Sequence, residues 1–176
     1  MASQKFAEQL NVQIGSEFAA HQQYLACAIY YDALTMPRMA AFFYRQALEE
    51  RDHAMMMVQY LIDADADVAI PGVDSPSNTF DDIVAPVRLA LDQEKRVSDQ
   101  INELTRIARE AGDFTSEQFT QWFIKEQVEE IATMSDLLTV VERSSADVEA
   151  IEEYVARELS SLPDDPTAPA IAGSDS

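Results

Sequence analysis

Apolar residues recur every three or four positions along most of the chain, which is the spacing of one face of an α-helix. The pattern fills four long segments, and glycine and proline are nearly absent from their interiors. We therefore predict long helices over residues 4–32, 37–63 or 37–66, 81–111 and 114–143. A shorter fifth helix should follow, capped by Ser144 or Ser145 and ending near Leu159.

The connections between these segments predict how the helices are arranged. Pro37 begins the second segment directly after a tight turn, so the first two helices are expected to lie antiparallel. Residues 67–80 are too irregular for a helix and much longer than an antiparallel hairpin requires, which predicts a crossover. The predicted fold class is all-α, a four-helix bundle with a long crossover between helices two and three and a short fifth helix.

Length and composition indicate one globular domain followed by a short tail. A chain of 176 residues is long enough to bury one core. We assign residues 1–160 to this domain and predict that residues 161–176, with their prolines and small polar residues, are disordered. The single cysteine, Cys27, lies among apolar residues and is expected to be a buried thiol without a catalytic role.

The chain is strongly acidic, with 32 acidic and 12 basic residues and a formal net charge of −20. This charge argues against nucleic acid as a partner, because binding to phosphates needs Lys and Arg, and it favours cations. No apolar run approaches the roughly 20 residues of a bilayer span, so no membrane partner is expected. The first residues lack the apolar core of a signal peptide, which predicts a cytoplasmic location.

Two pairs of the predicted helices carry the same polar pattern. In the first pair, Glu17 precedes Glu50 by 33 residues, and Glu50 and His53 lie one helical turn apart. The second pair repeats the pattern at an offset of 77 residues with Glu94, Gln127 and Glu130. Such a repeat indicates an internal two-fold in a bundle, with the polar residues at mid-height.

The repeated carboxylates lie on the core stripes of their helices. Glu94 shares its stripe with Leu91 and Ile101, and Glu130 shares its stripe with Met134. Converging buried carboxylates are very costly unless cations neutralise them. Each glutamate taken alone could lie on a solvated helix face, but the shared repeat, stripe and height favour a metal site.

The ligand types indicate which metal such a site would hold. Carboxylates outnumber imidazoles, which suits iron or manganese and disfavours structural zinc. A bridging carboxylate holds two metal ions about 3.5 to 4 Å apart in two-metal sites, and Glu50 is the natural bridge.

These residues resemble the bacterial non-haem ferritin family from the first helix through the short fifth one. The resemblance implies a ferritin-like subunit of a 24-subunit cage. It also implies oxidation of Fe(II) by O2 or hydrogen peroxide at a di-iron centre within the subunit, and storage as a ferric oxide mineral. The motifs that carry it are Glu17 with Tyr24, Glu49-Glu50-x-x-His53, Asp92-Gln93-Glu94, Gln121-Trp122-Phe123 and Glu126-Gln127-x-Glu129-Glu130.

The resemblance also implies a role for each matching residue. It implies one iron bound by Glu17, Glu50 and His53, and Tyr24 as a redox-active tyrosine. The second iron would have Glu50, Glu94 and Glu130 as ligands, with Gln127 close by. The additional third iron site of the family would comprise Glu49, Glu126, Glu129 and Glu130.

Departures from related patterns limit the alternatives. Bacterioferritins carry a second E-x-x-H and a haem-binding methionine, and this chain has Asp52 where that methionine would lie, so no haem is expected. A role for His21 stays open. The rival functions are a non-storage di-iron or dimanganese carboxylate oxidase, a miniferritin that protects DNA, and a helical scaffold without metal.

Overall fold

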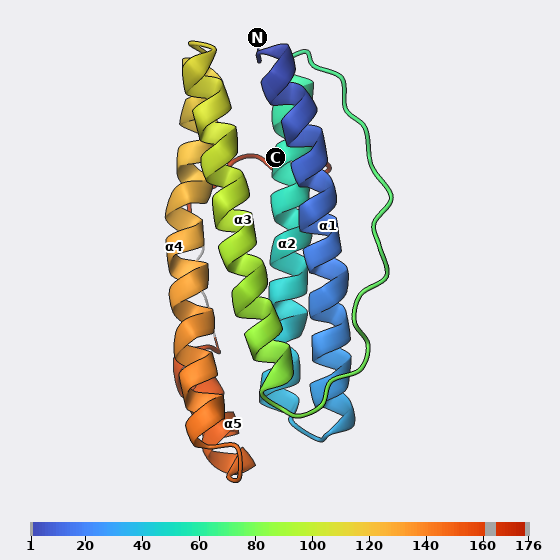
Figure 1. The fold of residues 1–176 in the computed structure, drawn as a ribbon, viewed down its shortest axis with the longest axis vertical. Coiled ribbons are helices and arrows are strands. Elements are labelled where there is room, and N and C mark those ends of the chain that lie inside the picture. The colour runs from blue at the N-terminus through green and yellow to red at the C-terminus, as the bar shows by residue number, and fades with distance from the viewer. Residues whose placement is uncertain (1, 161–164, 175–176) are drawn as a thin grey trace.

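The computed structural model describes residues 2–160 and 165–174 (Figure 1). Within these residues the chain forms five α-helices and no strand. Four long helices lie side by side along the long axis of the molecule, and a short fifth helix lies at one end. The predicted fold class is confirmed. The helices are α1 (Gln4–Ala33), α2 (Pro37–Asp63), α3 (Ala85–Glu110), α4 (Phe114–Arg143) and α5 (Val148–Glu158).

The long crossover between α2 and α3 runs along the outside of α1 for most of the bundle length (Figure 1). Two amide side chains of α1 bind its backbone. Asn11 accepts from the Ala69 N–H at 2.7 Å, and Gln23 accepts from the Ser77 N–H at 2.9 Å. These two hydrogen bonds hold the crossover against the bundle.

Two helix starts differ from the sequence prediction. α3 begins at Ala85, because the Asp82 carboxylate accepts from the N–H groups of Val84 and Ala85 and holds the preceding residues in a turn. α5 is capped by Asp147, whose carboxylate accepts from the Ala150 N–H at 3.1 Å. Ser144 or Ser145 was expected as that cap, but the chain is still turning away from α4 at these residues.

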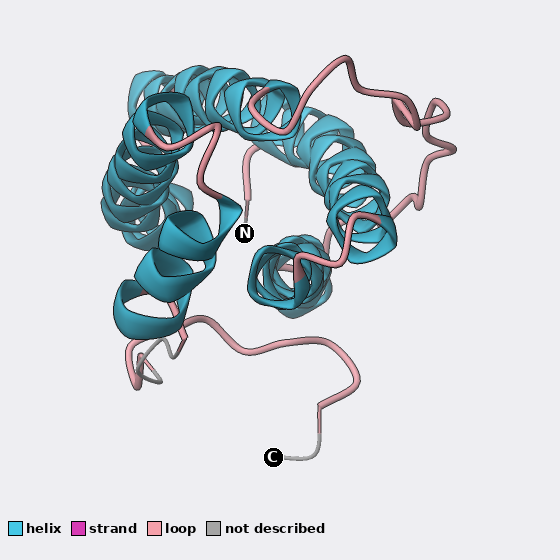
Figure 2. Cartoon of the chain, turned by 90° about the horizontal axis from the view of Figure 1, so that it is seen from below, coloured by secondary structure: helices cyan, strands magenta, loops and turns pink. Residues whose placement is uncertain are grey.

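The short helix α5 is attached to the start of α2. The Glu152 carboxylate accepts from the N–H groups of Arg38 and Met39, at 2.8 and 2.9 Å. These N–H groups lie in the first turn of α2, where no residue of α2 itself provides a side-chain cap. Glu152 therefore supplies the cap from another helix and positions α5 across the end of the bundle (Figure 2).

Residues 165–174 run along the bundle between α4 and α2 (Figures 1 and 2). Asp165 accepts from the Trp122 indole N–H at 3.1 Å, and the Ala172 N–H donates to the Met55 carbonyl at 3.2 Å. Residues 165–174 thus differ from the predicted disorder, because the apolar side chain of Ile171 packs on the core. Residues 161–164 and 175–176 of the predicted tail lie outside the described residues.

The core consists of two apolar clusters separated by a polar layer. One cluster surrounds Tyr31 and Phe43 near the α1–α2 turn, and the other surrounds Phe6 and Leu104 near the opposite end. The residues between them are buried although they are polar. They are Glu17, Glu50, His53, Glu94, Gln127 and Glu130. Among the described residues, no helix combines the length and the apolarity needed to cross a bilayer.

Asp113 connects the start of α4 to the start of α1. Its carboxylate accepts from the N–H of Ser116 at 3.1 Å and from the N–H of Ser3 at 2.7 Å. Replacing an N-cap aspartate by alanine typically costs about 1 kcal/mol. We expect Asp113→Ala to lower the thermal unfolding midpoint at fixed protein concentration, while Asp99→Ala on the exposed face of α3 leaves it nearly unchanged. Equal midpoints for the two variants would contradict the capping role.

Candidate metal centre

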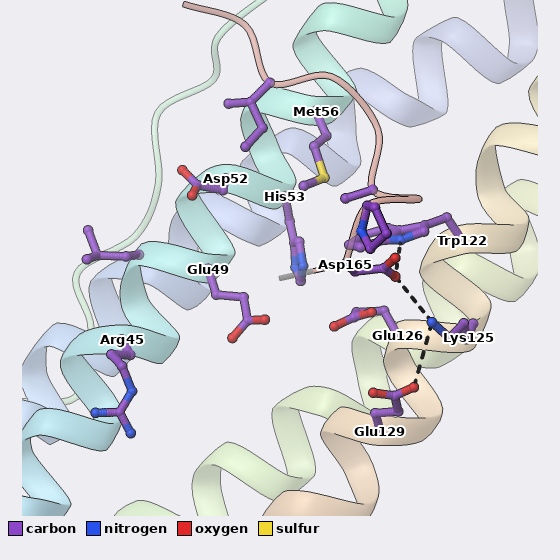
Figure 3. Close-up of a pocket in the computed structure, with 14 residues that line it drawn as sticks. Arg45, Glu49, Asp52, His53, Met56, Trp122, Lys125, Glu126, Glu129 and Asp165 are labelled. Atoms are coloured by element: carbon purple, nitrogen blue, oxygen red, sulfur yellow. Dashed lines mark hydrogen bonds and ion pairs between the residues drawn. The ribbon is translucent and has the colours of Figure 1, made fainter. Parts of the chain in front are cut away.

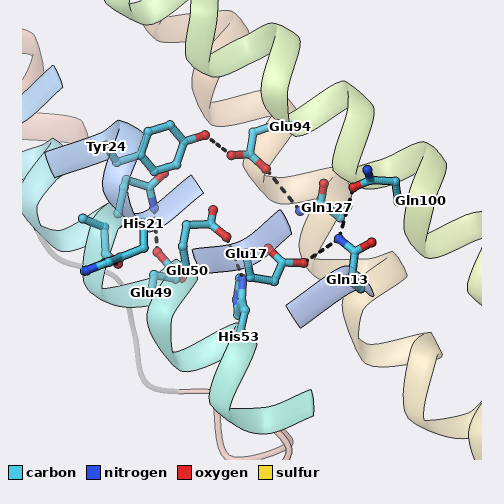
Figure 4. A network of polar contacts seen from close by, with 12 residues as sticks. Gln13, Glu17, His21, Tyr24, Glu49, Glu50, His53, Glu94, Gln100 and Gln127 are labelled. Carbon is cyan, nitrogen blue, oxygen red and sulfur yellow. Dashed lines mark hydrogen bonds and ion pairs between the residues drawn. The ribbon is translucent and has the colours of Figure 1, made fainter. Parts of the chain in front are cut away.

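The first half of the polar layer comes from α1 and α2. Glu17, Glu50 and His53 each offer a ligand atom, and these three atoms all lie within 4.8 Å of one another (Figure 4). The i, i+3 spacing places Glu50 and His53 on the same side of α2, with 3.4 Å between the Glu50 Oε2 and the His53 Nδ1. All three side chains are buried. This group therefore offers two carboxylates and one imidazole to a cation.

The second half of the layer comes from α3 and α4, with one contribution from α1. The Tyr24 hydroxyl donates to the Glu94 carboxylate, and the Gln127 Nε2 donates to its other oxygen at 3.2 Å (Figure 4). Glu130 lies one turn after Gln127 and is 5% exposed. The structure thus brings the Glu94 carboxylate into contact with Tyr24 and Gln127.

A second acidic group lies between α2 and α4. Glu49, Glu126 and Glu130 each offer a carboxylate oxygen, and these atoms lie within 4.8 Å of one another. Figure 3 shows the side chains of Glu49 and Glu126 pointing toward each other across the gap between the helices. The Gln46 Nε2 donates to Glu49 at 2.6 Å. Glu130 belongs to the core layer and also to this group, so it connects the two.

Glu129 is not part of this second acidic group. Its side chain is 64% exposed and lies 3.9 Å from the Lys125 ammonium, which also contacts Asp165 at 3.2 Å (Figure 3). The sequence resemblance placed four glutamates in a third site, and the structure brings three of them together. The second acidic group borders a cavity of about 600 Å³, which is lined by residues that include His53, Trp122, Glu126, Asp165 and Ile171.

Burial and mutual repulsion perturb the titration of the layer. Burial raises the pKa of Glu50 well above its ordinary value, and the nearby charges of Glu94 and Glu17 raise it further. Burial also raises the pKa of Glu130 and, despite the hydrogen bonds from Tyr24 and Gln127, the pKa of Glu94. Without a cation, these carboxyl groups therefore hold protons to higher pH than free carboxyl groups do.

Several buried oxygen atoms of the layer have no hydrogen-bond partner. They belong to Glu17, Glu50 and Gln127. Buried polar atoms are nearly always paired, so unpaired oxygens that converge on one place indicate a missing electropositive partner. A hard cation satisfies several such oxygens at once, and the residues present therefore fit iron or manganese.

Two polar residues beside the layer, Gln13 and Gln46, escaped the sequence prediction. Gln13 contacts Glu17 and Gln46 contacts Glu49, both at the spacing of one helical turn. That spacing was readable, but a glutamine on a long helix gives no sign of its partner. His21, whose role was open, lies outside both groups of ligand atoms, and its ring Nδ1 is hydrogen-bonded to the Ala47 carbonyl.

The fold and the site together define a class of protein, a four-helix bundle with a buried, carboxylate-rich site in its core whose residues suit a metal ion. Comparisons with known proteins agree. The family model described as the ferritin-like domain matches residues 7–144. Ferritin BfrB of Mycolicibacterium smegmatis is 50% identical over 169 residues, which is 96% of this chain and 93% of that protein. The M. tuberculosis relative, 49% identical over the same shares of both chains, is named bacterioferritin BfrB.

Two more distant relatives are also named ferritins. A bacterial non-heme ferritin of Staphylococcus aureus is 33% identical over 88% of this chain and 93% of that protein. The solved open-pore ferritin of Archaeoglobus fulgidus superposes with a TM-score of 0.84 at 29% identity, covering 89% of this chain and 96% of that one. This chain belongs to the ferritin family.

Proposed function

We propose that this protein is a ferroxidase that stores and detoxifies iron. It oxidises Fe(II) to Fe(III) at a di-iron site within each subunit and keeps the product as a ferric oxide mineral inside a 24-subunit cage. The observation that carries this proposal is the buried layer of carboxylates with unpaired oxygens. Such a layer is costly in the absence of cations, and its oxygen-rich composition suits iron.

The proposed ligands follow the two halves of the layer. Glu17, Glu50 and His53, whose ligand atoms lie within 4.8 Å of one another, hold one iron ion. Glu50 bridges to a second iron, which is the role that its central and buried position supports. The remaining ligands of the second iron are Glu94 and Glu130, with Gln127 alongside.

The proposed chemistry is an electron transfer from the bound substrate iron. Two Fe(II) ions give up two electrons, which with two protons reduce O2 to hydrogen peroxide or reduce hydrogen peroxide to water. Carboxylate ligands favour this oxidation because Fe(III) is the harder cation. Tyr24 is the proposed redox-active tyrosine, since its hydroxyl donates to Glu94 and its proton has a carboxylate to which it can move.

The second acidic group is proposed as an additional iron site. Glu49, Glu126 and Glu130 supply three carboxylates beside the cavity between α2 and α4. Because Glu130 belongs to both groups, an ion there would be close to the di-iron site. Glu129 is the proposed fourth member, and joining the site requires it to leave Lys125.

Iron loading tests the storage proposal directly. Graded Fe(II) is added aerobically to the assembled, metal-free protein, and the iron retained per subunit is measured after gel filtration. We expect retention of many more ions than the named carboxylates can coordinate, because the product accumulates as a mineral. Saturation at two or three ions per subunit would overturn the storage proposal and favour its rival, a non-storage di-iron or dimanganese carboxylate oxidase.

Two further predictions from the sequence stay predictions. Haem is not expected, and Asp52, in the position of the bacterioferritin methionine, forms an ion pair with Arg51 at 2.6 Å. The cytoplasmic location is likewise a proposal. Absorbance of the purified protein near the haem Soret band checks the first.

A further inference from the structure

Gln13 on α1 and Gln100 on α3 form a hydrogen-bonded pair beside Glu17 (Figure 4). The Gln13 Nε2 donates to the Glu17 Oε1 at 2.8 Å and to the Gln100 Oε1 at 3.2 Å. Gln13 is 1% exposed, so water does not compete for these bonds. The other oxygen of Glu17, Oε2, is buried without a partner. One oxygen of this carboxylate is therefore held, and the other is left for a ligand.

Two acceptors, the Glu17 carboxylate and the Gln100 carbonyl oxygen, favour the nitrogen end of the Gln13 amide. A glutamine amide has a donor end and an acceptor end of nearly equal shape. With the nitrogen turned inward, Gln13 serves two acceptors at once. With the oxygen turned inward, it would face the Glu17 carboxylate and the Gln100 oxygen, which is repulsive, and would leave buried groups unpaired.

We propose that Gln13 is a positioning residue of the metal centre and that Gln100 sets its orientation. The pair fixes the rotation of the Glu17 carboxylate so that Oε2 stays available to the metal ion that Glu50 and His53 also bind. This inference rests on the proposed function in one respect, namely that Glu17 is a metal ligand. Neither glutamine contacts the metal itself.

The expected loss of metal affinity follows from how metal sites respond when a hydrogen bond to a ligand is removed. Removing a hydrogen bond that orients a ligand typically weakens metal binding about 10- to 100-fold. Gln13→Met keeps the length of the side chain but removes the donor. Gln100→Met leaves the bond from Gln13 to Glu17 in place and removes only the group that orients it, so its effect should be smaller.

Co(II) binding tests this inference without any oxidation step. The assembled, metal-free protein is titrated with Co(II), and the visible absorption of the bound ion gives both affinity and ligand geometry. We expect Gln13→Met to raise the Co(II) dissociation constant about tenfold or more and to alter the spectrum, with a smaller change in the same direction for Gln100→Met. The matched control is Gln23→Met, which removes a largely buried α1 amide that binds the crossover at Ser77.

The outcomes separate this inference from the proposed function. Coincident titrations of wild type and Gln13→Met would overturn the positioning role and leave the ferroxidase proposal standing. An equal loss in Gln23→Met would also overturn it, because the effect would then be a general loosening of α1. A Glu17→Gln variant that binds Co(II) like the wild type would instead remove Glu17 from the site and both proposals with it. If Gln13→Met does not assemble, unchanged affinity in Gln100→Met overturns the inference.

Discussion

Replacing Glu50 by alanine is expected to slow the aerobic oxidation of Fe(II) about 100-fold or more at low iron loading. Glu50 is 2% exposed and is the proposed bridge, so its loss removes one ligand from each of two ions. A loss of about 3 kcal/mol in stabilisation corresponds to a rate factor of that order. Stopped-flow absorbance of Fe(III) formation, with two Fe(II) added per subunit, measures the rate.

A matched control separates loss of the site from loss of an acidic residue. Glu153→Ala removes an exposed glutamate on α5 and should oxidise Fe(II) at the wild-type rate. Co(II) binding in Glu50→Ala should weaken together with the rate, because both depend on the same ligand. Wild-type oxidation by an assembled Glu50→Ala protein would show that oxidation occurs elsewhere, for example on a growing mineral surface.

The stability of the metal-free protein is expected to fall as pH rises. Burial, reinforced by neighbouring glutamates, raises the pKa of Glu50 and of Glu130 in the folded protein, and burial raises the pKa of Glu94. In the unfolded chain these carboxyls titrate near about 4.3. The folded state therefore holds protons that the unfolded state has released, and folding is favoured most below the unfolded pKa.

This stabilisation is lost as pH rises from about 4.3 through the raised pKa values. Each carboxyl that is protonated only in the folded state contributes about 1.4 kcal/mol of lost stability per pH unit in that window. Thermal unfolding midpoints between pH 5 and pH 8 measure the slope. Saturating Zn(II) should reverse it, because metal binding requires deprotonated ligands.

Surface charge could produce a slope of the same sign, since the chain has a net charge of −20. Two controls distinguish the sources. High salt screens exposed charges much more than buried ones, so the contribution of the layer should persist in salt. Glu50→Gln should flatten the slope, while Glu153→Gln should not. A slope that salt abolishes and Glu50→Gln leaves unchanged would show that the layer does not hold protons.

The sequence alone was sufficient for the helices and for the members of the core layer. Helical periodicity over long uninterrupted segments predicted both ends of α4 correctly. The long irregular connection of residues 67–80 predicted the crossover between α2 and α3. The layer was predictable because helical spacing is local. An i, i+3 pair such as Glu50 and His53 must share one side of its helix whatever surrounds it.

The tertiary structure alone decided which polar side chains meet across helices. Glu49 lies on α2, yet its carboxylate lies within 4.8 Å of those of Glu126 and Glu130 on α4. No pattern within α1 shows that Gln13 meets Gln100 of α3. Contacts of this kind depend on how helices pack and on long-range burial, which sequence spacing does not encode.

The cap of α2 and the position of residues 165–174 were also decided by tertiary contacts. Glu152 caps α2 from α5, and Ile171 packs on a core formed by residues far earlier in the chain. Composition predicted disorder for residues 161–176, because the composition of a segment describes that segment in isolation. Sequence determined the elements and the chemistry they carry through local geometry. Packing between elements determined the groups of neighbouring carboxylates and the path of residues 165–174.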